Sequence, residues 1–150
     1  MITLLKNCDL YAPQSCGLND ILIAGEKIEA VAPAGSRFSG ISSSPEVEVR
    51  DLKGKKVTPG LIDIHVHVTG GGGEQGFASR VPESRMEDIA ETGVTTVLGL
   101  LGTDGVTRSL ENLYAKVMAL NEEGISAYML TGSYALPSTT LTGAVERDIA

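Results

Sequence analysis

Cysteine, tryptophan and long apolar runs are scarce in this 150-residue sequence, and each scarcity excludes a class of protein. The two cysteines, Cys8 and Cys16, belong to no CxxC motif and no Cys/His cluster, so we interpret them as structural or incidental residues rather than a disulfide framework. The sequence has no stretch of about 18 apolar residues, so we expect no membrane span. Because the first residues lack the basic and apolar segments of a signal peptide, we expect a cytoplasmic protein.

Excess basic charge is also missing, and this argues against nucleic acid as a partner. The sequence has 19 acidic and 12 basic residues, with a formal net charge of −7. Its basic residues form no continuous stripe, and two Phe with no Trp leave few side chains to stack on bases. A hydrophobic content of 42% is nevertheless enough for a packed core, so we predict a folded protein.

The first part of the sequence, residues 1–57, has the pattern of a small β-domain. Its apolar runs are short and are separated by turn signals and by a loop rich in Ser, Gly and Pro at 37–45. The pattern favours a small, incomplete β-sandwich or partial barrel over a helical domain. We predict strands within residues 2–11, 20–33 and 47–49.

The second part, residues 58–150, has the β-α-β-α-β order of a parallel sheet covered by helices. Pro82 and Ser109 mark helix starts, and Gly93 and Gly124 mark helix ends. Three strands are too few to close a (β/α)8 barrel, so we predict the first three units of one, cut in mid-element. The predicted elements are strands at 61–68, 94–101 and 125–130 and helices at 82–91 and 109–123.

The strand at 61–68 carries the strongest chemical signal. Strict alternation predicts that Asp63, His65 and His67 share one face, while the Ile and Val residues between them face the helices. Two imidazoles two residues apart on one face lie close enough to share a metal ion. We therefore predict that His65 and His67 are metal ligands and that Asp63 orients one of these ligands without binding the metal itself. The alternative is a pair of buried, hydrogen-bonded histidines without metal.

Polar residues follow each predicted strand, where the active site of a parallel α/β fold forms. Four glycines at 70–73 let the backbone approach a ligand closely, and Glu74 at their end is suited to a cationic amine. Thr103 and Tyr134 follow the next two strands and are candidates for the same pocket. A Tyr hydroxyl near a metal can donate to a carbonyl oxygen as charge develops on it. The alternative for each is a solvated loop residue.

Residues 59–67, Pro-Gly-Leu-Ile-Asp-Ile-His-Val-His, resemble the opening signature of the amidohydrolase superfamily. The sequence at 67–74, 97–104, 119–127 and 129–134 looks like that of the isoaspartyl (β-aspartyl) dipeptidases, and the resemblance covers essentially the whole chain. It implies an α/β fold, the N-terminal part of an amidohydrolase-type TIM barrel preceded by a small β-sandwich domain. It also implies a homo-oligomeric zinc metalloprotease with a small-molecule substrate, a β-aspartyl dipeptide.

The resemblance implies a role for each matching position. His65 and His67 would bind the more buried ion of a two-zinc site, and Glu74 would bind the free α-amino group of the substrate. Thr103 and the backbone around Gly72 would contact the substrate. The reaction would be attack by a metal-bridging hydroxide on the isopeptide bond.

Tyr134 would polarise the scissile carbonyl in the same scheme. The remaining metal ligands, the catalytic Asp and the carboxylate-binding arginines of the family have no counterpart in these 150 residues. We therefore expect the 150-residue chain alone to be inactive, because a catalytic zinc needs three protein ligands.

Two other functions remain open at the level of sequence. A cyclic amidase or N-acyl deacetylase would keep the metal centre, but an amine-binding Glu74 suits a dipeptide better than a neutral cyclic imide. A non-catalytic assembly protein with the same fold is the third possibility, against which the inward-facing His65 and His67 argue.

Overall fold

The computed structural model describes residues 1–149, and the chain divides into two compact units, Met1–Pro59 and Gly60–Ala150. The sequence predicts this boundary between residues 57 and 58, two residues before the boundary in the structure. No helix in the described part of the chain has both the length and the apolar character needed to cross a membrane.

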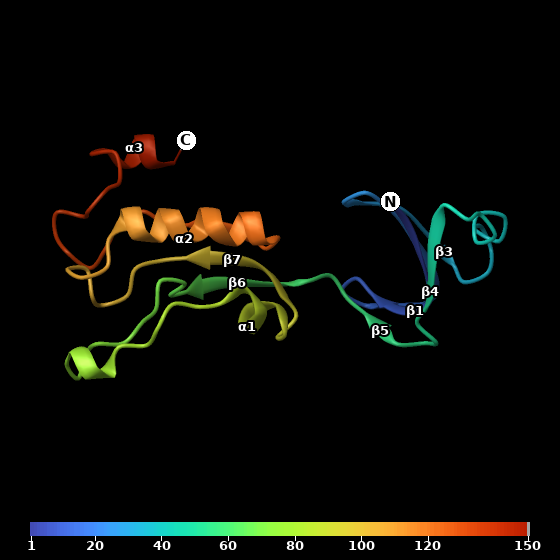
Figure 1. Ribbon diagram of the computed structural model, residues 1–150, viewed down its shortest axis with the longest axis horizontal. Helices are drawn as coiled ribbons and strands as arrows, with labels where there is room; N and C mark the ends of the chain where they lie inside the picture. Colours follow the sequence, from blue (N-terminus) through green and yellow to red (C-terminus); the bar gives the residue numbers. More distant parts are fainter. Residues whose placement is uncertain (150) are drawn as a thin grey trace. The chain divides into compact units, whose positions relative to one another are not determined.

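The first unit is built on one five-stranded sheet with the strand order β3-β2-β1-β4, in which β5 also pairs with β1 (Figure 1). Strand β2 runs antiparallel to β1 and β3, whereas β4 and β5 run parallel to β1. The β-sandwich prediction is met in part, because residues 1–59 form one sheet and a sandwich requires two. The strands are β1 (Ile2–Tyr11), β2 (Ser15–Ala24), β3 (Lys27–Pro33), β4 (Val47–Asp51) and β5 (Lys56–Val57).

The second unit contains a three-stranded parallel sheet with the order β6-β7-β8. This arrangement confirms the predicted α/β class and is that of the first units of a TIM barrel. Its elements are β6 (Leu61–Val66), the 3-10 helix η1 (Phe77–Ser79), α1 (Met86–Ala90), β7 (Val94–Gly99), α2 (Leu110–Glu123), β8 (Ser126–Met129) and α3 (Val145–Asp148).

Helix α2 lies along this sheet and begins and ends where the sequence predicts (Figure 1). The Ser109 hydroxyl accepts a hydrogen bond from the backbone N–H of Asn112, and Gly124 ends the helix with a φ of 106°. The apolar face of α2 packs on the sheet and builds the core of the unit. The buried core residues are Val68, Val97, Leu101, Leu110, Leu113, Val117, Leu120, Ile125 and Ala127.

The helix predicted at 82–91 is wrong in its first half, because α1 begins only at Met86. The backbone N–H of Ser84 donates to the carbonyl of Val68, which ties this segment to the end of β6 in place of a first helical turn. Arg85, at the N-cap position, makes no capping hydrogen bond with its side chain. Pro82, although proline is compatible with the first turn of a helix, therefore does not start one here.

The strict alternation predicted along β6 is wrong at Asp63. The pairing of β6 with β7 shifts register between Leu61 and Ile62 and again between Asp63 and Val66. Ile62 and Ile64 are 67% and 70% exposed rather than packed under helices. Asp63 and Val66 instead line one cavity of about 390 Å³ together with Ile89 of α1.

Candidate metal and substrate site

The two histidines lie close together at the carboxyl end of β6. His65 is exposed and His67 is half-buried, and their ring centroids are 5.3 Å apart at an interplanar angle of 79°. Nδ1 of His67 lies 3.1 Å from the carbonyl oxygen of Leu100. A carbonyl only accepts, so Nδ1 carries a proton, which leaves Nε2 as the nitrogen with which this ring would bind a metal.

Asp63 contacts the backbone of the pair rather than a ring. Its Oδ1 accepts a hydrogen bond of 3.1 Å from the backbone N–H of His65. The group that orients a ring is the Leu100 carbonyl in the loop after β7. Sequence reasoning missed this partner because a backbone carbonyl has no residue-type signal.

The histidine pair fits part of a metal site. The Nδ1–H group of His67 donates to the Leu100 carbonyl, and histidines that bind a metal through one ring nitrogen usually donate a hydrogen bond from the other. Residues 1–149 contain no cluster of three or more His, Cys, Asp or Glu side chains placed to hold a metal ion. Since a catalytic zinc takes three protein ligands, His65 and His67 would supply part of a ligand set.

The glycine-rich loop after β6 is held by Arg108, which lies just before α2. Its side chain is 6% exposed, and three of its nitrogens donate to backbone carbonyls of the chain around the loop. Nε donates to Thr69 at 3.0 Å, Nη1 to Gly71 at 3.1 Å and Nη2 to Val81 at 2.9 Å. Sequence reasoning did not single out Arg108, because an isolated arginine in a loop belongs to no recognisable pattern.

Gly72 is required by the path of this loop. Its φ is 69°, and a Cβ at this position would lie 2.5 Å from the carbonyl oxygen of Ser79. Gly72 also forms a β-bridge with Arg80, so the loop folds back on the segment that follows it. This path brings Glu74 to the loop after β7.

Glu74 and Thr103 meet although 29 residues separate them. The Thr103 hydroxyl donates to Oε1 of Glu74 at 2.7 Å, and this hydrogen bond is the main reason that the pKa of Glu74 lies below its ordinary value. The backbone hydrogen bond at Glu74 and the charge of Arg108 lower the same pKa further. Glu74 is therefore an ionised carboxylate at neutral pH, as recognition of an amine requires.

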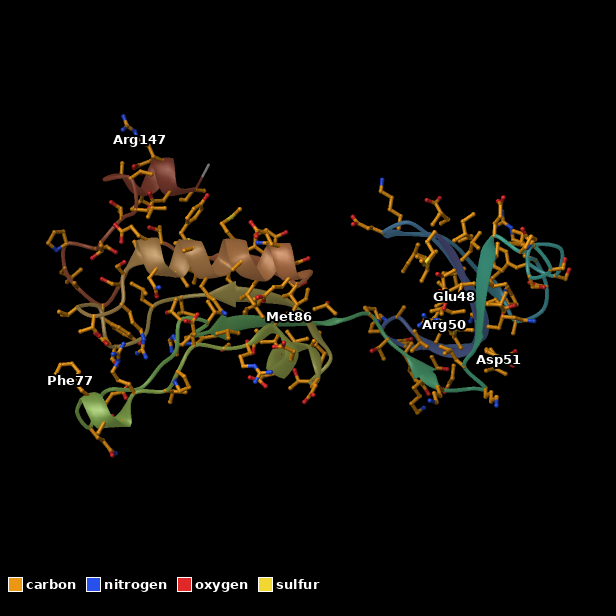
Figure 2. All side chains as sticks on the ribbon, in the orientation of Figure 1. Glu48, Arg50, Asp51, Phe77, Met86 and Arg147 are labelled. Carbon is orange, nitrogen blue, oxygen red and sulfur yellow. The ribbon has the colours of Figure 1, made fainter. Side chains whose placement is uncertain are left out.

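A cavity of about 360 Å³ opens beside this pair. Phe77 and Val106 contribute apolar surface to it, and Phe77 projects from η1 with 79% of its side chain exposed (Figure 2). A carboxylate at the edge of a partly apolar cavity suits a small ligand with an ammonium group.

Tyr134 lies in the loop after β8 and is 76% exposed. It lines a cavity of about 240 Å³ that includes Leu100, the residue whose carbonyl holds His67. Within the described residues, no hydrogen bond joins Tyr134 to the histidine pair or to Glu74. The structure thus brings His65 close to His67 and Glu74 into contact with Thr103, and it places Tyr134 beside Leu100.

We expect Thr103→Val to raise the pKa of Glu74 toward its ordinary value, because the variant removes the hydrogen bond that lowers it most. Carboxyl-resolved NMR titration measures the shift. Thr107→Val is the matched control, since the Thr107 hydroxyl donates to Asp104 and is the first cause of the low pKa of that carboxyl. The control should shift Asp104 and leave Glu74 unchanged; equal shifts of Glu74 in both variants would contradict the assignment.

A sequence profile described as "Amidohydrolase family" matches residues 48–143, more than half of the chain. A dihydroorotase of Lactobacillus leichmannii is 36% identical over 124 residues, which is 81% of this chain and 26% of that protein. The chain thus spans about a quarter of the length of this curated relative.

Solved structures of greater identity carry a different activity in their names. The β-aspartyl dipeptidase of Fervidobacterium islandicum AW-1 is 47% identical with a TM-score of 0.90, over 99% of this chain and 40% of that one. The same enzyme in complex with a β-Asp-Leu dipeptide gives a TM-score of 0.88 at 47% identity, over 99% of this chain and 38% of that one. The similarity to β-aspartyl dipeptidases expected from the sequence motifs is therefore confirmed.

Proposed function

This chain belongs to the amidohydrolase family, and we propose that the native protein containing it hydrolyses the isopeptide bond of β-aspartyl dipeptides. The observation that carries the proposal is the contact between Glu74 and Thr103, which holds an ionised carboxylate in place within the loops that follow β6 and β7. A β-aspartyl dipeptide has a free α-amino group for such a carboxylate to bind. The 47% identity with a β-aspartyl dipeptidase along nearly the whole chain supports the same substrate.

In this proposal, His65 and His67 would together hold one metal ion, and zinc is an ion that imidazole ligands suit. When bound, such a metal lowers the pKa of water and polarises a carbonyl group. A homo-oligomer, which the resemblance to β-aspartyl dipeptidases implies, and a cytoplasmic location are both part of the proposal.

The substrate is oriented by the loops after the strands. Glu74 binds the α-ammonium group, and Thr103 holds the Glu74 carboxylate in place while contacting the substrate. The backbone of Gly72 approaches the substrate without side-chain obstruction. Tyr134 donates a hydrogen bond to the scissile carbonyl oxygen as negative charge develops there.

A second candidate function is hydrolysis of a cyclic amide. The 36% identity with a dihydroorotase over most of the chain is the observation that favours it. Glu74 separates the two candidates, because an ionised carboxylate pairs with an ammonium group and repels an anionic cyclic substrate.

We expect the purified native protein to cleave β-Asp-Leu, to leave α-Asp-Leu and dihydroorotate intact, and to lose activity on chelation until zinc is restored. Chromatographic detection of free aspartate measures the reaction. The 150-residue chain assayed alone is the control, and we expect it to be inactive because it supplies two histidine ligands only. Preferential ring opening of dihydroorotate would overturn the proposal in favour of the cyclic amidase.

A further inference from the structure

We propose that Asp148 is a positioning residue for Tyr134, because its carboxylate closes the base of the loop at 131–142 that carries this tyrosine. The inference rests on the proposed function, in which Tyr134 acts on the scissile carbonyl. It adds a role for α3, an element that lies outside the site described above.

The Asp148 carboxylate receives four hydrogen bonds from the two ends of this loop. The Thr131 hydroxyl, at the start of the loop, donates to Oδ2. At the end of the loop, the backbone N–H of Leu141 donates to Oδ2 at 2.8 Å. The backbone N–H and the hydroxyl of Thr142 donate to Oδ1 at 2.9 Å and 2.6 Å. One side chain therefore joins residues that enter and leave the loop.

We refer to the Asp148 carboxylate and its four hydrogen bonds as the clamp. This carboxylate is ionised, and one of its partners is fixed to the core of the unit. The hydroxyls of Thr131 and Thr142 hold the pKa of Asp148 well below its usual range, and the backbone N–H groups add to the effect. Leu141 packs against the apolar core that α2 and the sheet share. Hydrogen bonds to an ionised acceptor are about twice as strong as neutral ones, so this clamp dominates the closure of the loop.

Tyr134 itself lies in a smaller loop, residues 133–139, whose ends are joined by contacts of uncharged hydroxyl and backbone groups. Oγ of Ser133 and Oγ1 of Thr139 are 3.1 Å apart, and the backbone N–H of Ala135 donates to Oγ of Ser133 at 3.3 Å. Since the Tyr134 side chain is 76% exposed, packing does little to hold it. The position of its hydroxyl therefore depends on the shape of the loop and, through the loop, on Asp148.

The test compares Asp148→Asn with Glu146→Gln in the native protein. Asparagine removes the charge and turns an amide donor toward groups that also donate. Glu146 lies on the same short helix, is exposed and makes no side-chain hydrogen bond within the described residues, so it is a matched control. Thr131→Val is a second, milder variant that removes the single bond from the start of the loop.

We expect Asp148→Asn to lower kcat for a β-aspartyl dipeptide by about 10- to 100-fold, as misplacement of a catalytic group by about 1 Å does. KM should stay within about twofold of the wild-type value, since the contact with Tyr134 is made in the transition state. Thr131→Val should lower kcat less, and Glu146→Gln should leave it unchanged. The double variant with Tyr134→Phe should be no slower than Tyr134→Phe alone.

Multiplicative losses in the double variant would overturn the inference, because Asp148 would then act independently of Tyr134. A kcat for Asp148→Asn equal to that of Glu146→Gln would also overturn it. If the wild-type protein cleaves no β-aspartyl dipeptide, the proposed function fails, and hydrogen exchange of residues 131–142 still tests the clamp. Exchange faster in Asp148→Asn than in Glu146→Gln supports it, and equal exchange refutes it.

Discussion

Replacement of His67 by Gln is expected to lower zinc content and to reduce kcat/KM for a β-aspartyl dipeptide by about 100-fold or more. Loss of a group behind a metal ligand already costs about 10- to 100-fold, and loss of a ligand costs at least as much. Glutamine keeps an amide that can donate to the Leu100 carbonyl, so the fold around the site should survive. Metal analysis and steady-state kinetics on the native protein measure both effects.

His65→Gln should have an effect of the same order, because the ring centroids of His65 and His67 lie 5.3 Å apart and both side chains would hold the same ion in the proposed site. Asp63→Asn is the matched control on the same strand. The Asp63 carboxylate contacts the backbone of His65 rather than a ring, and an amide oxygen accepts the same hydrogen bond. Full zinc content in His65→Gln and His67→Gln would show that the pair is not a metal site.

The sequence predicted those elements of the fold whose ends and buried faces are determined by neighbouring residue types. Helix α2 has a serine N-cap, a glycine at its end and a regular apolar stripe, and all three signals agree with its packing. The start of α1 was not predictable, because a backbone hydrogen bond from Ser84 to Val68 outweighs the signal of Pro82. The predicted side-chain alternation along β6 failed at Asp63, because the register shift between Asp63 and Val66 leaves no trace in residue type.

The candidate site divides in the same way. Residue types with unusual chemistry, such as His65, His67 and Glu74, could be singled out from the sequence. Arg108 and Asp148 could not, because arginines and aspartates are common in loops and solvated helices. Their roles depend on partner groups that the fold brings close to them, from 27 to 39 residues away for Arg108 and from 6 to 17 residues away for Asp148.

Replacement of Arg108 by Met should cause the largest loss of stability among the single changes considered. The buried carbonyl of Thr69 and the partly buried carbonyl of Val81 would lose the donors that Arg108 provides, and an unpaired buried acceptor costs about 1–3 kcal/mol. Gly71 keeps one donor, the backbone N–H of Val81. We therefore expect the free energy of unfolding to fall by about 2–5 kcal/mol, measured by denaturant unfolding of the native protein.

The same change should also weaken substrate binding, since Arg108 fixes the loop that leads to Glu74. Arg108→Lys should recover part of the stability, because one ammonium group keeps the charge but does not span three carbonyls. Arg85→Met is the control: Arg85 forms an ion pair with Glu87 in which both side chains are mostly exposed, and such pairs contribute about 0–1 kcal/mol. If Arg108→Met and Arg85→Met unfold at the same denaturant concentration, the glycine loop is held by its own backbone contacts, and the role assigned to Arg108 is wrong.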